Sequence, residues 1–174
     1  MQEATTRARS VKIAIFDVDG VMTDGTLFLS DSGEEIKAYN VLDGHGLKML
    51  KQSGVELAII TSRSSRSVER RAQNLDIRHL YQGSHDKLAT FNSLLETLGL
   101  KATEACYMGD DVIDLPVMRQ AGLAVSVPSA PAVVKKHAHY VTRALGGHGA
   151  VRECCEMIMT AQATLDGILN EYLE

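Results

Sequence analysis

Two aspartates, Asp17 and Asp19, directly follow a short apolar run at residues 13–16. A buried strand has no structural need for two like charges at its end, because unpaired charge is costly to bury. One carboxylate beside a metal ion can attack phosphorus, and a second, two residues on, can donate and accept protons. Gly20 lets the chain turn away behind them. This stretch therefore indicates phosphoryl-transfer chemistry.

Other polar residues stand at corresponding places after later apolar runs. Ligands of parallel α/β sheets bind at the carboxyl ends of the strands, so residues at these ends meet at one edge. The residues expected there are Asp17, Asp19, Thr61, Lys87, Asp110, Asp111 and Asp114. For Asp114, stabilisation of a helix N-terminus is an alternative explanation.

Five carboxylates in a small site require a cation, because like charges raise one another's pKa. Oxygen ligands without His or Cys favour Mg²⁺, which completes its shell with water and substrate phosphate. Thr61 and Lys87 are suited to bind the oxygens of the transferring phosphoryl group. The sequence therefore predicts a magnesium-dependent site.

The elements that must position these residues alternate between apolar runs and helical patterns. Dense aliphatic runs are typical of strands covered on both faces, and the alternation favours a parallel sheet. We predict an α/β fold, a Rossmann-like parallel sheet with helices on both faces. The expected strands are 11–17, 55–61, 77–83, 104–110 and 122–127, and the expected helices are 44–53, 64–74, 86–98 and 111–121.

Three further segments complete the expected organisation of one domain over residues 1–174. Residues 25–40 contain two β-like runs around a turn at Asp31-Ser32-Gly33, which predicts a β-hairpin inserted after the first strand. A glycine-rich loop at 146–149 precedes a pattern that we interpret as one continuous C-terminal helix. The polar residues 1–10 are interpreted as a short frayed leader.

Composition limits the function classes. The net charge of −4 gives no reason to expect nucleic acid or an anionic membrane as a partner. No apolar stretch reaches the roughly 20 residues of a membrane helix, and we expect a cytoplasmic protein. Three cysteines lack zinc-ligand spacing and are expected to be reduced structural thiols: Cys106, Cys154 and Cys155.

Four motifs in order, DVDGVMTDG, IITSR, Lys87 and GDDVIDLPVM, resemble the haloacid-dehalogenase superfamily of phosphotransferases. The resemblance implies that Asp17 is the nucleophile and Asp19 the acid/base. It implies Mg²⁺ bound by Asp17, the main-chain carbonyl of Asp19, and Asp110. Asp111 and Asp114 would then be supporting acids, and Thr61 and Lys87 would bind phosphate.

Longer stretches, including YNVLDGHGLKML and YVTRALGGHGAVRE, resemble the capless phosphatases of that superfamily that act on an eight-carbon acidic sugar phosphate in lipopolysaccharide synthesis. Close relatives act on nine-carbon acidic sugar phosphates. The resemblance places the following residues around the substrate: Asp19, Asn40, Val41, Leu42, Asp43, Gly44, Lys48, Arg63, Arg71 and Lys87. Lys48 stands where these relatives have Arg, so its contact would be a point charge rather than a bidentate one.

Only 43 residues separate Asp17 from Thr61, and the hairpin, a helix and a strand occupy them. No lid domain fits, so neighbouring copies would have to cover the site. The resemblance implies a homotetramer whose hairpins line a central barrel and whose C-terminal tail enters a neighbouring site. The candidate tail residues are Gly147, His148 and Arg152, and the sequence leaves open whether they act on their own or a neighbouring site.

Several alternatives differ in what they require. A phosphomutase would need a cap, and a dehalogenase would not need an acid at Asp19. A phosphorylated signalling receiver has its acidic pair before the acceptor aspartate, the reverse of the order here. A phosphatase of nine-carbon esters and a catalytically silent assembly module of the same fold stay open.

Overall fold

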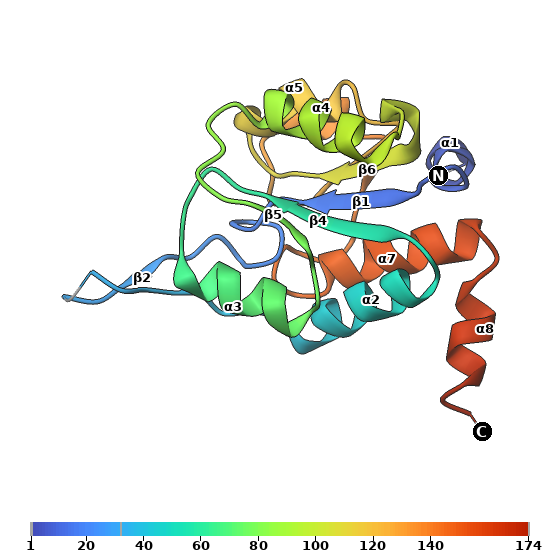
Figure 1. Cartoon of the computed structure of the whole chain (residues 1–174), viewed down its shortest axis with the longest axis horizontal. Coiled ribbons are helices and arrows are strands. Elements are labelled where there is room, and N and C mark those ends of the chain that lie inside the picture. Colours follow the sequence, from blue (N-terminus) through green and yellow to red (C-terminus); the bar gives the residue numbers. More distant parts are fainter. Residues whose placement is uncertain (1, 32, 174) are drawn as a thin grey trace.

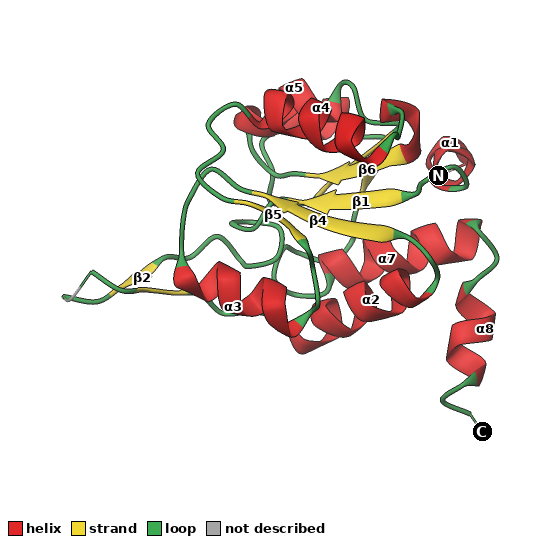
Figure 2. Ribbon diagram, in the orientation of Figure 1, coloured by secondary structure: helices red, strands yellow, loops and turns green. Residues whose placement is uncertain are grey.

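The computed structural model describes residues 2–31 and 33–173 and has a parallel six-stranded sheet at its centre (Figure 2). The strand order is β5-β4-β1-β6-β7-β8, so the order reverses at β1, where ligands of such sheets bind. The strands are β1 (Ile13–Phe16), β4 (Glu56–Ile60), β5 (His79–Tyr81), β6 (Ala105–Met108), β7 (Leu123–Ser126) and β8 (Tyr140–Val141). The five predicted strands are confirmed, each shorter than expected. The two residues of β8 are too few to give a pattern.

Helices cover both faces of the sheet, as predicted (Figure 1). On one face lie α4 (Lys87–Leu98), α5 (Leu115–Met118) and α6 (Ala132–His137), and on the other lie α2 (Val41–Gln52), α3 (Arg66–Asn74) and α7 (Ala150–Ala161). Two 3₁₀ turns, Ala102–Glu104 and Val112–Asp114, flank β6. The helix expected over 111–121 is therefore a 3₁₀ turn followed by the short α5, which begins at Leu115 with Pro116 in its first turn.

Helix α4 shows why the sequence positions Lys87 as it does. The Asp86 carboxylate accepts a hydrogen bond from the backbone N–H of Ala89 at 2.9 Å, which caps the helix. Gly99 ends it in the left-handed conformation with φ of 65°. Phe91 and Leu94 are buried against the sheet. Lys87 is thus fixed as the first helical residue, at the edge where β1 ends.

Both chain ends differ from expectation. Residues Gln2–Ala8 form a helix, α1, with Ala4 and Ala8 buried and Arg7 Nη1 donating to the Gly122 carbonyl at 3.0 Å. The prediction of a frayed leader was wrong for these residues, because two small side chains suffice to pack so short a helix; Met1 lies outside the described residues. The continuous C-terminal helix was also wrong. It divides into α7 and α8 (Leu165–Asn170), and Ala163 between them has φ of 56°.

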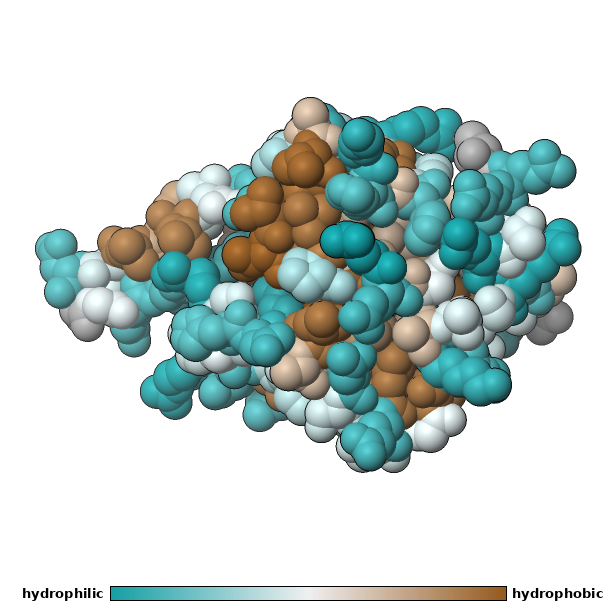
Figure 3. Space-filling view, turned by 90° about the horizontal axis from the view of Figure 1, so that it is seen from above, coloured by the Kyte–Doolittle hydropathy of each residue, from teal (hydrophilic) through white to brown (hydrophobic). Residues whose placement is uncertain are grey.

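The predicted hairpin is confirmed as β2 (Phe28–Leu29) paired antiparallel with β3 (Glu35–Ile36), and it projects beyond the sheet (Figure 1). In its turn, Ser32 lies outside the described residues. The projecting part carries hydrophobic side chains on its surface (Figure 3), among them Phe28, Leu29 and Ile36. So short a hairpin gains little stability by itself. Among the described helices, none is long and apolar enough to cross a membrane.

Candidate active site

The register of the three central strands brings the predicted site residues together. Phe16 is level with Ile59 on one side and Met108 on the other, so β1 and β6 end at the same height and β4 runs one residue further. The residues that follow therefore meet at one edge. Asp17 is tied there by its backbone N–H, which donates to the Met108 carbonyl at 3.0 Å.

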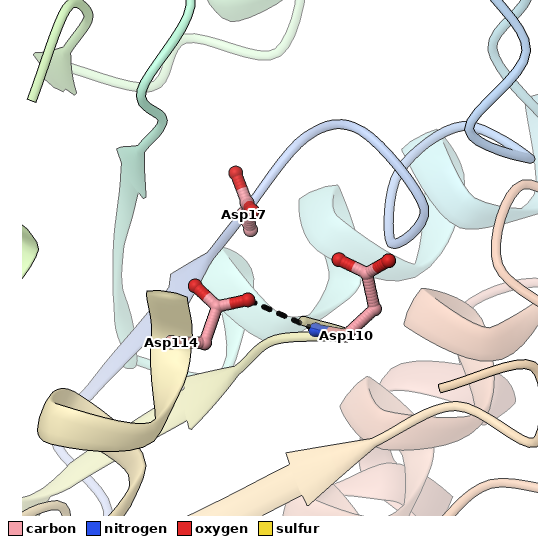
Figure 4. Close-up of side chains that lie close together, drawn as sticks. All are labelled: Asp17, Asp110 and Asp114. Atoms are coloured by element: carbon pink, nitrogen blue, oxygen red, sulfur yellow. Dashed lines mark hydrogen bonds between the residues drawn. The ribbon is translucent and has the colours of Figure 1, made fainter. Parts of the chain in front are cut away.

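Three carboxylates form the centre of this edge (Figure 4). Asp17, Asp110 and Asp114 each place an oxygen within 4.8 Å of the others. Asp114 is fully buried, and its Oδ2 accepts from the backbone N–H groups of Asp110 at 3.0 Å and Asp111 at 3.1 Å. Its Oδ1 accepts from Lys87 and, at 2.7 Å, from the Tyr107 hydroxyl. Both oxygens of Asp114 are thus occupied by the protein, which makes it a scaffold for the other two acids.

Lys87 joins the nucleophile candidate to this scaffold. Its buried Nζ donates to Asp17 Oδ2 at 2.6 Å and to Asp114 Oδ1 at 2.7 Å. Burial by itself lowers the pKa of Lys87, but the two carboxylates raise it overall, so the ammonium stays charged. The other Asp17 oxygen accepts from the backbone N–H of Val18 at 2.7 Å. The Asp17 carboxylate is therefore held on both sides.

Burial and crowding disfavour negative charge at this edge. Burial, and then repulsion by Asp114, raises the pKa of Asp17 to about 6. Burial, followed by repulsion from Asp17 and Asp114, raises the pKa of Asp110 to about 7. A divalent cation between Asp17 and Asp110 would remove this repulsion, and an all-oxygen donor set suits Mg²⁺. The residues present therefore fit the predicted metal.

Glycines allow the loops to close around the acids. Gly20 has φ of 81°, and a side chain there would place its first carbon 2.0 Å from Asp110 Oδ2. A side-chain carbon at Gly146 would lie 1.8 Å from the Gly20 carbonyl oxygen, and the backbone N–H of Gly147 donates to the Val21 carbonyl at 3.0 Å. The glycine-rich loop therefore packs on the site loop of its own chain.

An open cavity of about 210 Å³ lies over the acids. Thr61, which is buried, lines it as predicted. Asp111 is exposed at the rim, and its carboxylate caps the 3₁₀ turn by accepting from the Val112 N–H at 2.7 Å. The lining residues are Asp17, Asp19, Gly20, Gly25, Thr61, Ser62, Arg63, Asp110, Asp111 and Ile113.

Asp19 lines the same cavity but has different partners. Its Oδ1 accepts a hydrogen bond from the buried Lys37, and its Oδ2 lies 4.0 Å from Arg63 Nε. Lys37 also contacts Glu35 Oε1 at 2.7 Å, and Arg63 Nη2 contacts Glu35 Oε2 at 2.5 Å. The second aspartate is therefore held from the hairpin rather than from the sheet.

A second, larger cavity of about 600 Å³ lies between the hairpin and α3. Arg71 lines it, and its Nη2 donates to the Asn40 carbonyl at 2.9 Å while its guanidinium stands 5.3 Å from the centre of the Tyr39 ring. Thr61 to Arg63 line the smaller cavity and Ser64 to Ser67 the larger one, so a single connection borders both.

The start of α2 is divided between exposed and structural residues. Val41 and Leu42 are exposed, and the Asn40 side chain caps the helix by accepting from the Leu42 N–H at 2.8 Å. Asp43 is buried and accepts from the backbone N–H of Arg152 at 2.8 Å and of Gly149 at 3.3 Å, which holds the start of α7. Gly44 lies beneath Arg71, and the exposed Lys48 points from the same helix.

The structure does not bring the predicted tail residues into the small cavity of their own chain. His148 is exposed in the glycine-rich loop. The Arg152 side chain lies along α7, where its Nε donates to Glu156 Oε1 at 2.6 Å. A role for either in a neighbouring site stays a prediction.

Four contributors were missed by the sequence analysis. Tyr107 supports Asp114, and the buried Ser126 hydroxyl donates to the Gly109 carbonyl at 2.8 Å, which fixes the turn before Asp110. Glu35 and Lys37 hold Asp19. The alternation of side chains along a strand puts Glu35 and Lys37 on one face of the hairpin, which was the available signal.

Comparisons with known proteins identify the family of this chain. The sequence profile of the haloacid dehalogenase-like hydrolases matches residues 31–122. A 3-deoxy-D-manno-octulosonate 8-phosphate phosphatase from Yersinia pestis is 49% identical over 161 residues, spanning 92% of this chain and 86% of that protein. Its counterpart in Escherichia coli strain K12 is 46% identical over 160 residues, with 92% and 85% covered.

A solved structure gives the same result in three dimensions. The 3-deoxy-D-manno-octulosonate 8-phosphate phosphatase from Moraxella catarrhalis, in complex with magnesium, phosphate and the sugar, superposes with a TM-score of 0.97. It is 43% identical, and the match spans 99% of each chain. This chain therefore belongs to the haloacid dehalogenase-like hydrolases, in the group of 3-deoxy-D-manno-octulosonate 8-phosphate phosphatases.

Proposed function

We propose that this protein is a phosphoric monoester hydrolase that converts 3-deoxy-D-manno-octulosonate 8-phosphate to the free sugar acid and phosphate, in lipopolysaccharide precursor synthesis. The observation that carries the proposal is the Asp17 carboxylate, buried and held by Lys87 beside Asp110 at the base of an open cavity. A carboxylate oriented in this way is arranged to attack a phosphorus atom that enters from the cavity.

The reaction would proceed in two displacements. An Asp17 oxygen forms a bond to phosphorus as the bond from phosphorus to the sugar oxygen breaks, and Asp19 gives its proton to that leaving oxygen. Asp19 then takes a proton from a water molecule that attacks the aspartyl-phosphate and releases phosphate and Asp17. Thr61, which lines the cavity, and Lys87, whose ammonium contacts Asp17, would stabilise the phosphoryl oxygens as negative charge develops.

Asp17, Asp110 and the main-chain carbonyl of Asp19 would hold Mg²⁺. The bound ion would neutralise the phosphate charge and withdraw electrons from phosphorus. Asp114 is not assigned as a ligand, because each of its oxygens already accepts two hydrogen bonds within the protein, whereas each Asp17 oxygen accepts one. Its role is to hold Lys87 and the backbone of Asp110 in place.

An acidic sugar phosphate also needs cations for its own carboxylate. Arg63 is exposed at the rim of the small cavity, and Arg71 lines the large one. We propose that the sugar extends from the phosphate site toward Arg63 and Arg71, past the α2 start at residues 40–44, with Lys48 as a more distant charge. Asp43 contributes there by holding the α7 loop, since its oxygens bind backbone N–H groups.

We further propose that the protein works as a homotetramer in the cytoplasm. The site is open, and the hairpin exposes Phe28 and Leu29, which association through hairpins would bury. Three free, buried cysteine thiols favour a reducing compartment. Sedimentation of Leu29→Glu, with Leu169→Glu on α8 as the control, tests the assembly; dissociation is expected only for the hairpin variant.

The activity is tested by phosphate release from 3-deoxy-D-manno-octulosonate 8-phosphate with and without Mg²⁺. Nonulosonate 9-phosphates and hexose phosphates are measured beside it, with Asp17→Asn as the control. Preference for a nine-carbon ester would keep the mechanism and change the substrate. A folded, magnesium-binding protein without turnover of any ester would overturn the proposal and favour the silent module.

A further inference from the structure

Lys37 is an unusual residue for the hairpin. The hairpin exposes its large apolar side chains, yet the Lys37 side chain, one residue beyond β3, is 0% exposed. A lysine normally keeps its ammonium in water, and burial of the charge is costly unless it is paired. Lys37 is therefore turned inward for a reason that the apolar packing of the hairpin does not supply.

The partners of Lys37 give that reason. Its ammonium lies between the carboxylates of Asp19 and Glu35, and Glu35 in turn contacts Arg63. Arg63 also approaches the second oxygen of Asp19, but only to 4.0 Å, and nearly half of its side chain is exposed. An exposed pair at that distance is a weak restraint. Among these groups, Lys37 is the one that fixes the Asp19 carboxylate.

We infer that Lys37 is a positioning residue that holds the Asp19 side chain at the mouth of the cavity for its two proton transfers. The inference rests on the proposed function, because it takes Asp19 as the acid/base. Lys37 touches no reacting atom in this role. Proton transfer needs the carboxyl group within hydrogen-bond reach of the leaving oxygen, so a loosely held Asp19 transfers its proton less often.

Leaving-group dependence distinguishes positioning of an acid from general damage. A sugar oxygen is a poor leaving group and needs the proton, whereas p-nitrophenolate leaves without one. The value of kcat/KM reports steps up to departure of the leaving group, so it isolates the first proton transfer. We expect Lys37→Met to lower kcat/KM for the sugar phosphate by about 100-fold, within the range for general acid catalysis. For p-nitrophenyl phosphate the expected loss is less than about 5-fold.

A double-mutant cycle with Asp19→Asn tests whether Lys37 acts through Asp19. If it does, Lys37→Met in the Asp19→Asn background causes no further loss for the sugar phosphate, because the group that it positions is already absent. Lys51→Met is the matched control, since Lys51 pairs with Asp76 far along α2. That variant should keep wild-type values for both substrates. Lys37→Arg, which retains the charge, should recover part of the activity lost in Lys37→Met.

The outcomes separate the inference from the proposed function. If Asp19→Asn lowers kcat/KM equally for the sugar phosphate and for p-nitrophenyl phosphate, the acid role of Asp19 is wrong, and the inference about Lys37 fails with it. The second outcome is that Asp19→Asn lowers kcat/KM mainly for the sugar phosphate, but Lys37→Met lowers it equally for both substrates. Only the positioning role of Lys37 is then wrong, and the same holds if the losses caused by Lys37→Met and Asp19→Asn are additive. If Lys37→Met does not fold, Lys37→Gln takes its place in the same comparison. The double variant of Lys37→Gln with Asp19→Asn then completes the cycle, because it leaves no unpaired charge between the two positions.

Discussion

Two buried lysines in this molecule each join two carboxylates, and they differ in what holds them. Lys87 begins α4 and binds Asp17 and Asp114, which follow the central strands β1 and β6. Lys37 leaves a projecting two-stranded hairpin and binds Asp19 and Glu35. The first group is anchored in the core, and the second is held by a segment that packs little against the rest.

The difference corresponds to the two kinds of chemistry proposed for the site. A nucleophile that must meet phosphorus in one geometry benefits from rigid strand ends. An acid/base that serves first a sugar oxygen and then a water is better placed on the side that opens to substrate. Segments that move to admit ligands come from the least stable parts of a fold. The hairpin has two-residue strands with exposed apolar side chains, whereas the last residues of the central strands are buried.

The largest effect on activity is expected at the core group, which consists of Asp17, Lys87 and Asp114. Asp17→Asn removes the proposed nucleophile, and phosphate release should fall by at least about 1,000-fold, as for loss of other catalytic nucleophiles. The fold should persist, because removing one charge also relieves repulsion with Asp114. Steady-state assays with circular dichroism check both points. A variant that keeps more than a tenth of wild-type turnover would remove Asp17 from the mechanism.

Replacing the two lysines should change the free energy of unfolding by different amounts. Lys87→Met leaves Asp17 and Asp114 buried without their cation, and loss of one partner of a buried pair costs about 3–5 kcal/mol. Lys37→Met should cost less in global unfolding, because the short hairpin can rearrange while the sheet stays folded. Urea titrations of both variants, with Lys51→Met as the surface control, measure the free energies. Equal losses for Lys87→Met and Lys37→Met would mean that the two lysines are anchored equally firmly.

The sequence predicted the site residues at the strand ends better than those on the hairpin. Three residues were predictable because they follow neighbouring parallel strands that end at one edge of the sheet: Asp17, Thr61 and Asp110. Lys87 was predictable because α4 begins directly after its capping residue, Asp86. Strand alternation puts Glu35 and Lys37 on one face of the hairpin, but it does not predict that they meet Asp19, because the path of the hairpin decides that residue 37 returns to residue 19. Tyr107 was missed because a tyrosine in a strand is ordinarily a core residue.

A pH experiment on the magnesium-free protein sharpens the description of the core group. The unfolded chain loses the protons of Asp17 and Asp110 near pH 4, whereas burial keeps their folded pKa values at about 6 and about 7. The folded state therefore binds more protons between these values, and this contribution to stability is lost as the pH rises from about 4 to about 7. Each pKa unit corresponds to about 1.4 kcal/mol, so the rises of Asp17 to about 6 and of Asp110 to about 7 together make this loss at most about 7 kcal/mol.

Magnesium should reverse that trend, because the ion binds the ionised carboxylates and competes with protons. The rise in melting temperature on adding Mg²⁺ should be larger at pH 8 than at pH 5. Asp110→Asn should reduce both the pH dependence without metal and the response to the ion. An equal response to Mg²⁺ at the two pH values would mean that these acids do not hold it.

The smallest effect is expected for Tyr107→Phe, which tests how much redundancy the core group has. The variant removes one of four hydrogen bonds to Asp114 and leaves Lys87 and the two backbone N–H groups in place. A lost hydrogen bond to a buried charged group costs about 1.5–3 kcal/mol, and the three remaining donors should keep the loss near the lower value. Turnover should stay within about tenfold of wild type, since Asp17 keeps both its contacts. Urea unfolding and steady-state kinetics measure the two effects. A loss of turnover as large as that of Lys37→Met would instead mean that the core group depends on each of its members. The core group would then be no more rigid than the hairpin.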